Sequence, residues 1–275
     1  MTEKKCVLIT GVSGGMGRAA AKKLISEGFS AFGLDIKEQE ETPGLTFIKT
    51  DLTDASSVDE AFRKIEASGA KLDCIVNMAG IYDMNSLVEM SEEDFKKIFD
   101  VNVFASYRVN KTFLPLLSDG GRIIIVTSEL APLDPLPFTG IYGVTKAALE
   151  KYAASLRMEL QLLGHPVSVI RPGAVDTALL GVSTSRLESF TENTKLYSYN
   201  AKQFSDIVAR VEAKKVPPER VARLAFRAAT AHRPKLFYNI NRNPLLRILS
   251  ALPDRVQCFI IKMILTEKNK SAGKR

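Results

Sequence analysis

Short apolar runs alternate along this chain with longer segments in which apolar residues recur every three or four positions. The helical pattern covers residues 17–28, 57–67 and 142–163, and Ser91 with the three acidic residues after it marks the start of another helix. The apolar runs predict buried strands at residues 6–10, 31–34, 46–48, 74–76, 123–126 and 167–170. Continuous apolar strands between helices are typical of α/β proteins whose parallel sheet is covered by helices on both faces.

Two regions depart from this alternation. Residues 179–215 are polar, rich in Ser and Thr and only weakly periodic, which predicts a mobile lid. From residue 239 onward the chain is basic and apolar together, and 244–266 has a helical pattern with a break near 252–254. Apolar residues recur there at helix spacing, at Val256, Phe259, Ile260, Met263 and Ile264. We therefore divide the chain into a main domain, 1–238, and a basic amphipathic C-terminal extension, 239–275.

The distribution of charge supports that division. The 275 residues carry 38 Lys and Arg against 31 Asp and Glu, a net charge of +7. Residues 232–275 alone hold ten basic and two acidic side chains, a balance of +8, and the rest of the chain carries −1. The extension can therefore lie on an anionic bilayer surface, pack on the body of the protein or contact another subunit. No nucleic-acid-binding motif accompanies the charge, so we expect no nucleic-acid partner.

Composition narrows the class further. With 45% hydrophobic and 25% charged residues the chain is typical of globular proteins, and no apolar run reaches the ~18–20 residues of a membrane span. Three separated cysteines and two histidines predict no metal site, no disulfide scaffold and no histidine-based triad. The N-terminal residues lack the apolar segment of a secretory signal. We expect a reducing, cytoplasmic setting, with peripheral membrane association through the extension as an open alternative.

A glycine-rich loop follows the first predicted strand and opens the first predicted helix. It has the sequence Thr10-Gly11-Val12-Ser13-Gly14-Gly15-Met16-Gly17. Glycines there permit a tight turn and let backbone N–H groups approach a pyrophosphate at the positive end of the helix dipole. A plain strand-to-helix turn is the alternative interpretation.

The acidic residue at the end of the second strand favours the dinucleotide. Asp35 lies 18 residues after Gly17, where a carboxylate can accept hydrogen bonds from both ribose hydroxyls and repel a 2′-phosphate. Gly14 leaves no basic side chain in the loop to hold that phosphate. We therefore predict NAD as the cofactor, with NADP the less favoured choice.

A tyrosine and a lysine lie one turn apart at the start of the long predicted helix. The four-residue spacing places Tyr142 and Lys146 on one helix face. A free tyrosine, with a pKa of ~10, is a poor base at neutral pH, and a neighbouring ammonium group lowers that pKa. The tyrosine can then exchange a proton with an alcohol or a carbonyl while hydride moves at the adjacent carbon.

Together with three further segments, these motifs resemble the short-chain dehydrogenase/reductase family. The further segments are Asp51-Leu52, Asn77-Met78-Ala79-Gly80 and Arg171-Pro172-Gly173-Ala174-Val175-Asp176-Thr177, and the resemblance spans roughly residues 5–238. It implies a catalytic tetrad of Asn102, Ser128, Tyr142 and Lys146. It also implies cofactor contacts at Gly11, Ser13, Gly14, Gly15, Met16, Gly17, Asp35, Asp51, Leu52, Asn77, Ala79, Gly80, Tyr142, Lys146, Pro172, Gly173, Val175 and Thr177.

The resemblance also implies a role for each group. Tyr142 would be the general acid and base, and Lys146 would hold the nicotinamide ribose and lower the tyrosine pKa. Ser128 would hydrogen-bond the substrate oxygen, and Asn102 would hold a water that feeds a proton relay. Val175 and Thr177 would contact the carboxamide, and Asp51 and Leu52 would frame the adenine.

The sequence departs from the family pattern in two places. Met78 stands where the family usually has a second asparagine. The interval from Ser128 to Tyr142 is about one residue longer than expected, and Glu129 competes with Ser128 for the role of the serine. We choose Ser128 because it ends an apolar strand.

The resemblance completes the predicted fold and function. The fold is a Rossmann-like, doubly wound parallel sheet of about seven strands with helices on both faces and a helical C-terminal extension. Residues 1–238 form the catalytic domain, with the lid at about 179–215, and the chain is expected to form a homodimer or homotetramer. The predicted function is NAD-dependent interconversion of a secondary alcohol and a ketone. A non-catalytic dinucleotide-binding scaffold or regulatory protein is the alternative.

The apolar residues around the lid suggest an apolar alcohol or ketone as the substrate, such as a hydroxysteroid. The long lid and the extension resemble the family branch that acts on hydroxysteroids and retinoids. One expected wall consists of Leu130, Leu133, Leu136 and Phe138, and the lid would contribute Leu179, Leu180, Phe190, Leu196, Tyr197, Tyr199 and Phe204. These side chains can equally serve only to pack the lid onto the body.

Overall fold

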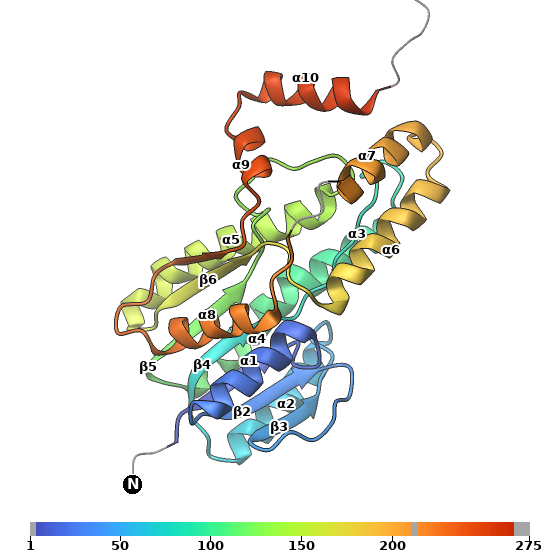
Figure 1. Ribbon diagram of the computed structural model, residues 1–275. Coiled ribbons are helices and arrows are strands. Elements are labelled where there is room, and N and C mark those ends of the chain that lie inside the picture. Colours follow the sequence, from blue (N-terminus) through green and yellow to red (C-terminus); the bar gives the residue numbers. More distant parts are fainter. Residues whose placement is uncertain (1–3, 211–213, 267–275) are drawn as a thin grey trace, which may run out of the picture.

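Seven parallel strands form one sheet in the centre of the molecule (Figure 1). The computed structural model describes residues 4–210 and 214–266, without the side chains at 179, 180, 182 and 183. The strands, in chain order, are β1 (Cys6–Thr10), β2 (Ser30–Asp35), β3 (Leu45–Lys49), β4 (Leu72–Asn77), β5 (Leu117–Val126), β6 (Val167–Pro172) and β7 (Phe237–Ile240). They lie in the order β3-β2-β1-β4-β5-β6-β7. The prediction of about seven parallel strands is confirmed.

Helices cover both faces of this sheet. The described α-helices are α1 (Gly15–Ser26), α2 (Ala55–Ala67), α3 (Glu92–Phe99), α4 (Ala105–Phe113), α5 (Gly140–Leu160), α6 (Ala178–Asn193), α7 (Ser198–Arg210), α8 (Pro218–Thr230), α9 (Pro244–Ser250) and α10 (Asp254–Leu265). A π-helical turn, η1 (Asp100–Phe104), joins α3 to α4, and short 3₁₀ turns follow α4 and α5. Ser91 caps α3 as predicted, because its hydroxyl accepts a hydrogen bond from the Asp94 N–H at 3.0 Å.

The apolar core is divided by the sheet into two layers. On one face, α1 and α8 bury small side chains such as Ala20 and Ala225 against the sheet. On the other face, α2, α4 and α5 contribute Val58, Val109 and Leu149. A parallel strand buried on both faces is apolar throughout, which is why the central strands form continuous apolar runs in the sequence.

The strand order reverses between β1 and β4. From β1 the chain builds outward to β2 and β3, and from β4 it builds the other way to β5, β6 and β7. At such a switch point the loops after the carboxyl ends of the strands diverge and leave a crevice, which is where ligands bind in open α/β sheets. The fold therefore positions the glycine loop after β1 and the segments after β4, β5 and β6 around one crevice.

The weak periodicity of residues 179–215 predicts a mobile lid, and the described part of this segment is mainly helical. Most of residues 179–215 lie in α6 and α7, and Leu187, Phe190, Ala201 and Phe204 are buried in a small separate cluster. The apolar contacts of these four residues attach both helices to the rest of the protein, although most residues of the segment are polar. Because the periodicity of the sequence is weak here, it does not predict the two helices.

The C-terminal extension forms two helices separated where the sequence predicts a break. The carboxyl end of α10 packs on α7, where the Asn200 side chain donates to the Leu265 carbonyl at 2.8 Å. Its amino end is held by Gln257, which donates to Asp134 at 2.9 Å. Strand β7 reaches Ile240, so the sheet continues two residues into the range assigned to the extension.

Candidate active site

The glycine loop lies directly against the segment that follows β4. Gly11 has a φ of +70°, and a Cβ atom there would sit 2.8 Å from the Ala79 backbone. A Cβ at Gly17 would sit 2.1 Å from the Gly11 carbonyl oxygen. Only glycine fits at these two positions, because real Cβ contacts are longer and positive φ disfavours other residues. The Thr10 hydroxyl then accepts hydrogen bonds from the N–H groups of Met78 and Ala79 at 3.1 and 3.2 Å.

The amino end of α1 is left open by this loop. Its N-cap residue, Gly14, has no side chain to bond the first N–H groups, and the first turn of α1 contains no acidic residue. Unpaired N–H groups and the positive end of the helix dipole together attract an anion. A Cβ at Gly15 would sit 2.7 Å from Thr177, so the segment after β6 closes the other side of the loop. The residues present therefore fit the pyrophosphate of a dinucleotide.

Asp35 is tied to the glycine loop from the end of β2. Its carboxylate oxygens accept hydrogen bonds from the N–H groups of Ser13 and Lys37, both at 3.0 Å. Each oxygen retains a further acceptor site for a ribose hydroxyl. Arg18 donates to the Ser13 carbonyl at 3.5 Å, so the first turn of α1 places a cation beside the loop that the sequence interpretation did not consider.

The residues predicted to frame the adenine, and Asn77 at the end of β4, are hydrogen-bonded to other parts of the protein. The Asp51 carboxylate accepts hydrogen bonds from Thr53, and the Leu52 carbonyl accepts one from Arg108 at 2.5 Å. The Asn77 amide donates to Asn110 at 2.8 Å within the body of the protein. Asp51, Leu52 and Asn77 do not line the cavity that holds the catalytic candidates.

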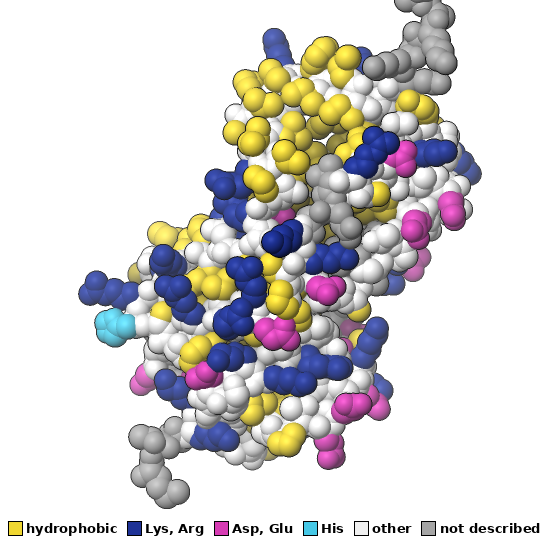
Figure 2. Space-filling view, in the orientation of Figure 1, with side chains coloured by type: hydrophobic (Ala, Val, Ile, Leu, Met, Phe, Trp, Pro, Cys, Tyr) yellow, Lys and Arg dark blue, Asp and Glu magenta, His cyan; other side chains and the backbone are white. Residues whose placement is uncertain are grey.

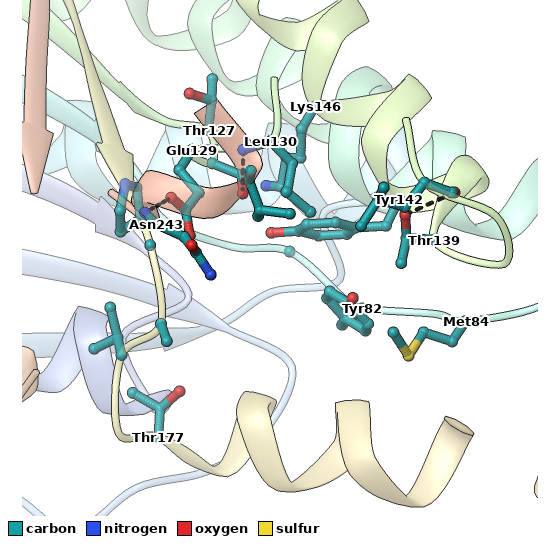
Figure 3. A pocket seen from close by; sticks show the side chains of 18 of the residues that line it. Tyr82, Met84, Thr127, Glu129, Leu130, Thr139, Tyr142, Lys146, Thr177 and Asn243 are labelled. Atoms are coloured by element: carbon teal, nitrogen blue, oxygen red, sulfur yellow. Dashed lines mark hydrogen bonds between the residues drawn. The ribbon is translucent and has the colours of Figure 1, made fainter. Parts of the chain in front are cut away.

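That cavity, of about 370 Å³, lies beyond the carboxyl ends of the central strands (Figure 3). It brings together three of the four tetrad residues with the cofactor candidates after β1, β4 and β6. Predicted site residues on its lining are Met16, Gly80, Ser128, Tyr142, Lys146, Pro172, Gly173, Val175 and Thr177. Residues on its lining that were not assigned to a site include Tyr82, Met84, Thr127, Glu129, Asn243 and Leu246.

Tyr142 lies at the centre of this group. Its side chain is buried, its hydroxyl hydrogen-bonds to the Ser128 side chain, and its ring packs on Tyr82 with the two centroids 4.3 Å apart. One turn further along α5, the Lys146 ammonium lies 5.7 Å from the Tyr142 ring centre and 3.4 Å from the Val126 carbonyl oxygen. The structure therefore places Tyr142, Ser128 and Lys146 together.

Asn102 lies behind this group, in the π-helical turn η1. Its side chain is fully buried, and its Oδ1 accepts from the Ile81 N–H at 2.8 Å. Its Nδ2 donates to the Ile81 carbonyl and to the Thr145 hydroxyl at 3.0 and 3.1 Å. The side chain thus fixes the segment after β4 to α5 beside Lys146. A π-helical turn of this kind is frequent at functional sites.

The pKa values of the pair differ from the sequence expectation. Burial raises the pKa of Tyr142 above its ordinary value of 10, Tyr82 adds to the increase, and the Ser128 hydrogen bond opposes it. Burial also lowers the pKa of Lys146 to about 8. The sequence analysis expects a lowered tyrosine pKa, whereas the net pKa of Tyr142 is raised, because desolvation of the phenolate outweighs the effects that favour it.

The walls of the cavity only partly match the apolar residues expected from the sequence. Leu130, Leu136 and Phe204 line it. Phe138 instead packs against Phe190, Tyr197 and Phe204 in an aromatic cluster that attaches the lid. Leu133 lies outside the lining, and Leu196 and Tyr199 are exposed. The side chains of Leu179 and Leu180 lie outside the described part of the chain.

Known proteins similar to this chain carry dehydrogenase and reductase names. The family model described as short chain dehydrogenase matches residues 5–188. The NADPH-dependent 3-dehydrocapnine reductase of Ornithobacterium rhinotracheale is 30% identical over 266 residues, 90% of this chain and 93% of the relative. The L-2,3-butanediol dehydrogenase of Corynebacterium glutamicum is 30% identical over 220 residues, 74% and 84% of the two chains.

Further similarities concern a yeast relative and solved structures. The NADPH-dependent 1-acyldihydroxyacetone phosphate reductase of Schizosaccharomyces pombe is 32% identical over 209 residues, 72% of this chain and 70% of the relative. A short-chain dehydrogenase structure from Streptomyces avermitilis superposes with a TM-score of 0.76 at 22% identity, covering 95% and 96% of the two chains. The match to the family model spans strands β1 to β6, the glycine loop and helix α5.

Burial of Lys146 has a consequence for stability that can be measured. Between about pH 8 and 10.5 the unfolded chain holds a proton at this position that the folded chain does not, so stability contributed by this site rises with pH. Below that window the full cost of burying the charge, roughly 3 kcal/mol, is present. Relative to Lys146→Met, the wild type should therefore gain stability across the window in urea unfolding. Lys151 is exposed on α5, so Lys151→Met is the matched control. If the difference in unfolding free energy between wild type and variant is independent of pH for both substitutions, this interpretation of Lys146 is wrong.

Proposed function

The chain belongs to the short-chain dehydrogenase family, and we propose that it is an NAD-dependent oxidoreductase that interconverts a secondary alcohol and a ketone. One observation carries the proposal: Tyr142 is buried, is hydrogen-bonded to Ser128, and lies one helical turn from Lys146 in the cavity beside the glycine loop. Burying a phenol and an ammonium group together costs free energy, and a chemical role accounts for retaining both.

Each residue of the site is assigned a role in this proposed reaction. A bound nicotinamide dinucleotide supplies or accepts the hydride. Ser128 orients the substrate oxygen and Tyr142 exchanges a proton with it. Because burial keeps Tyr142 protonated, the site is poised to donate a proton to a ketone oxygen. Alcohol oxidation needs the phenolate, which the charge of Lys146 favours. Asn102 keeps the segment after β4 fixed to the helix that carries the pair.

The proposed preference for NAD rests on Asp35. Its carboxylate faces the glycine loop, where it can bond ribose hydroxyls and where it would repel a 2′-phosphate. Two relatives are named as NADPH-dependent, and Arg18 offers a cation beside the loop. We still favour NAD, because Asp35 reaches the loop N–H directly whereas Arg18 is exposed and bonded to the Ser13 carbonyl.

The proposed substrate is apolar, with a hydroxysteroid as the type case. The lining of the cavity supports this, because Met78, Ile81, Leu130, Leu136 and Phe204 all contribute apolar walls.

We propose two contact surfaces for the protein. A homodimer or homotetramer would form through α4 and α5, because Phe104 at the end of η1, Tyr107 on α4 and Val144 on α5 expose apolar side chains. The second surface is the outward side of the extension, and we assign it to an anionic bilayer.

The outward side of α9 and α10 combines apolar and basic residues. Phe259 and Met263 are more than half exposed, at 63% and 56%, although the opposite side of α10 packs on α7. Arg255 and Lys262 lie beside Phe259 on the helix surface, and Asp254 is the only acidic residue from 244 to 266. Figure 2 shows hydrophobic side chains gathered where Figure 1 places these helices, with Lys and Arg at the rim. This pattern suits an amphipathic helix lying in the interface of an anionic membrane.

Within the described residues, no helix is long and apolar enough to cross a membrane. The bilayer contact that we propose is therefore peripheral. We place it on the cytoplasmic side, where a reducing setting suits the three unpaired cysteines. The Leu246 side chain lines the cavity, so this surface continues toward the substrate site.

Replacement of the tyrosine tests the proposed chemistry. Tyr142→Phe removes the proton donor and should lower turnover of a panel of secondary alcohols and ketones by about 10²- to 10⁴-fold. Tyr199→Phe, at an exposed tyrosine on α7 outside the cavity lining, should leave turnover unchanged. Wild-type activity in Tyr142→Phe would refute the mechanism. Dinucleotide binding without turnover of any compound by the wild type would favour the non-catalytic scaffold instead.

The same assay tests the cofactor preference. The wild type should show a higher kcat/KM with NAD than with NADP, and Asp35→Asn should narrow that difference because it removes the charge that repels the 2′-phosphate. A wild type that prefers NADP would overturn this part of the proposal and would assign Arg18 the role of the phosphate partner.

A single set of variants tests the two surfaces. The wild type should sediment with vesicles of phosphatidylcholine and phosphatidylglycerol, and much less with phosphatidylcholine alone. The double variant Phe259→Asp, Ile264→Asp should lose this binding, whereas Leu162→Asp, 82% exposed in the 3₁₀ turn that follows α5, should keep it. Light scattering should give a dimer or tetramer mass for all three proteins. A mass that falls only in the double variant would assign the α9–α10 surface to a second copy of the chain.

A further inference from the structure

Glu129 is an acidic side chain buried in the wall of the mostly apolar cavity. It follows Ser128 directly and is only 6% exposed. Its backbone N–H donates to the Pro172 carbonyl at 2.8 Å, which fixes this position against the end of β6. Figure 3 shows the Glu129 and Tyr142 side chains extending into the same cavity from neighbouring walls. The chemistry assigned to the tetrad does not use this carboxyl group.

The two oxygens of Glu129 have different surroundings. Oε2 accepts a hydrogen bond from the Asn243 N–H at 2.5 Å, at the start of α9. Oε1 lies against Gly173, 2.8 Å from the position that a Cβ atom would take there. Among the described residues, no hydrogen bond reaches Oε1 and no ion pair forms with Glu129. One acceptor of a nine-tenths buried carboxyl group is thus left for something that enters the cavity.

The local charges make this arrangement costly for the unliganded protein. Burial raises the pKa of Glu129, and the Asn243 N–H and the Arg242 charge only partly oppose that effect. A buried carboxylate with an unused acceptor is stabilised by a hydrogen-bond donor, most strongly by a charged one. An apolar residue would serve better at this position if the substrate were apolar throughout.

We propose that Glu129 binds a second polar group of the substrate, a hydroxyl or a protonated amine on a carbon next to the reacting one. The inference rests on the proposed function, which places the reacting oxygen at Ser128 and Tyr142. Ser128 and Glu129 are consecutive residues that both line this cavity, so a substrate held at Ser128 lies beside the residue that carries the carboxyl group. The substrate class is then a vicinal diol or a 2-amino alcohol, or the corresponding ketone, on an otherwise apolar skeleton.

Equilibrium binding tests this independently of turnover. Calorimetry with the NADH-loaded protein compares octan-2-ol, octane-2,3-diol and 3-aminooctan-2-ol, which share one apolar chain. The wild type should bind the diol or the amino alcohol at least about tenfold more tightly than octan-2-ol. Glu129→Leu should abolish that ratio. Glu129→Gln retains an acceptor oxygen without the charge, so it should spare part of the preference for the diol and remove the preference for the amine.

A second variant separates recognition from support of the extension. Asp134 also holds the extension, by accepting from Ser250 and Gln257, but it is not on the cavity lining. Asp134→Ala should therefore keep the binding ratio. Loss of the ratio in both variants, or a wild type that binds all three compounds equally, would overturn the inference. So would a Glu129→Leu variant whose Kd for NADH rises by the same factor, because the carboxyl group would then serve the cofactor.

The same compounds separate this inference from the proposed function. If the wild type shows the binding ratio but oxidises none of the three compounds with either dinucleotide, the proposed function fails and the recognition by Glu129 stands. If it oxidises all three with equal kcat/KM and binds them equally, the proposed function stands and the inference fails.

Discussion

The close packing of the glycine loop, both on itself and on the segment after β4, is the constraint on which the rest of the site depends. Gly17 lies so close to the Gly11 carbonyl that a single methyl group would not fit. The chain can therefore turn tightly between the end of β1 at Thr10 and the start of α1 at Gly15, with the amino end of the helix open to the crevice. Asp35 and Thr177 reach the same loop from two other strands. One backbone contact thus aligns three separate chain segments around the place where an anion would bind.

Burial shifts the pKa values of Tyr142 and Lys146 in opposite directions, upward for the tyrosine and downward for the lysine. Both shifts favour the neutral form. A phenolate would be stabilised by a charged Lys146, and a charged Lys146 by a phenolate, but burial opposes both charges. Their charge states are therefore sensitive to what else enters the cavity. The Ser128 hydrogen bond and the Asn102 bonds hold the geometry fixed, so that a change in charge need not move the side chains.

The sequence was sufficient for features that depend on local pattern. The continuous apolar strands, the Ser91 cap, the break before Asp254 and the shared helix face of Tyr142 and Lys146 follow from short-range spacing. The placement of Ser128 beside this pair followed instead from the family resemblance. Strand β7 was missed because it has only four residues, one of them exposed. The helices of the lid were missed because their few buried residues are spread among polar ones.

Features that depend on long-range contacts could not be predicted. The bond between Glu129 and Asn243 joins residues 114 positions apart, and no local pattern indicates it. The direction of the Tyr142 pKa shift depends on how completely the surrounding loops exclude water, which spacing along one helix does not reveal. The sequence motifs were enough to identify the reactive groups. The burial and the hydrogen-bond partners of these groups could be known only from the three-dimensional structure.

The central claim is that the Gly11–Gly17 loop holds the pyrophosphate of a nicotinamide dinucleotide beside Tyr142. The most direct measurement is NADH binding, followed by fluorescence, to the wild type and to Gly17→Ala and Gly181→Ala. A Cβ atom at Gly181 meets no other atom within 4 Å, so that variant controls for the substitution itself. We expect Gly17→Ala to stay folded by circular dichroism but to lose NADH binding, and Gly181→Ala to bind NADH as the wild type does. A folded Gly17→Ala variant with wild-type affinity for NADH would contradict this assignment of the loop.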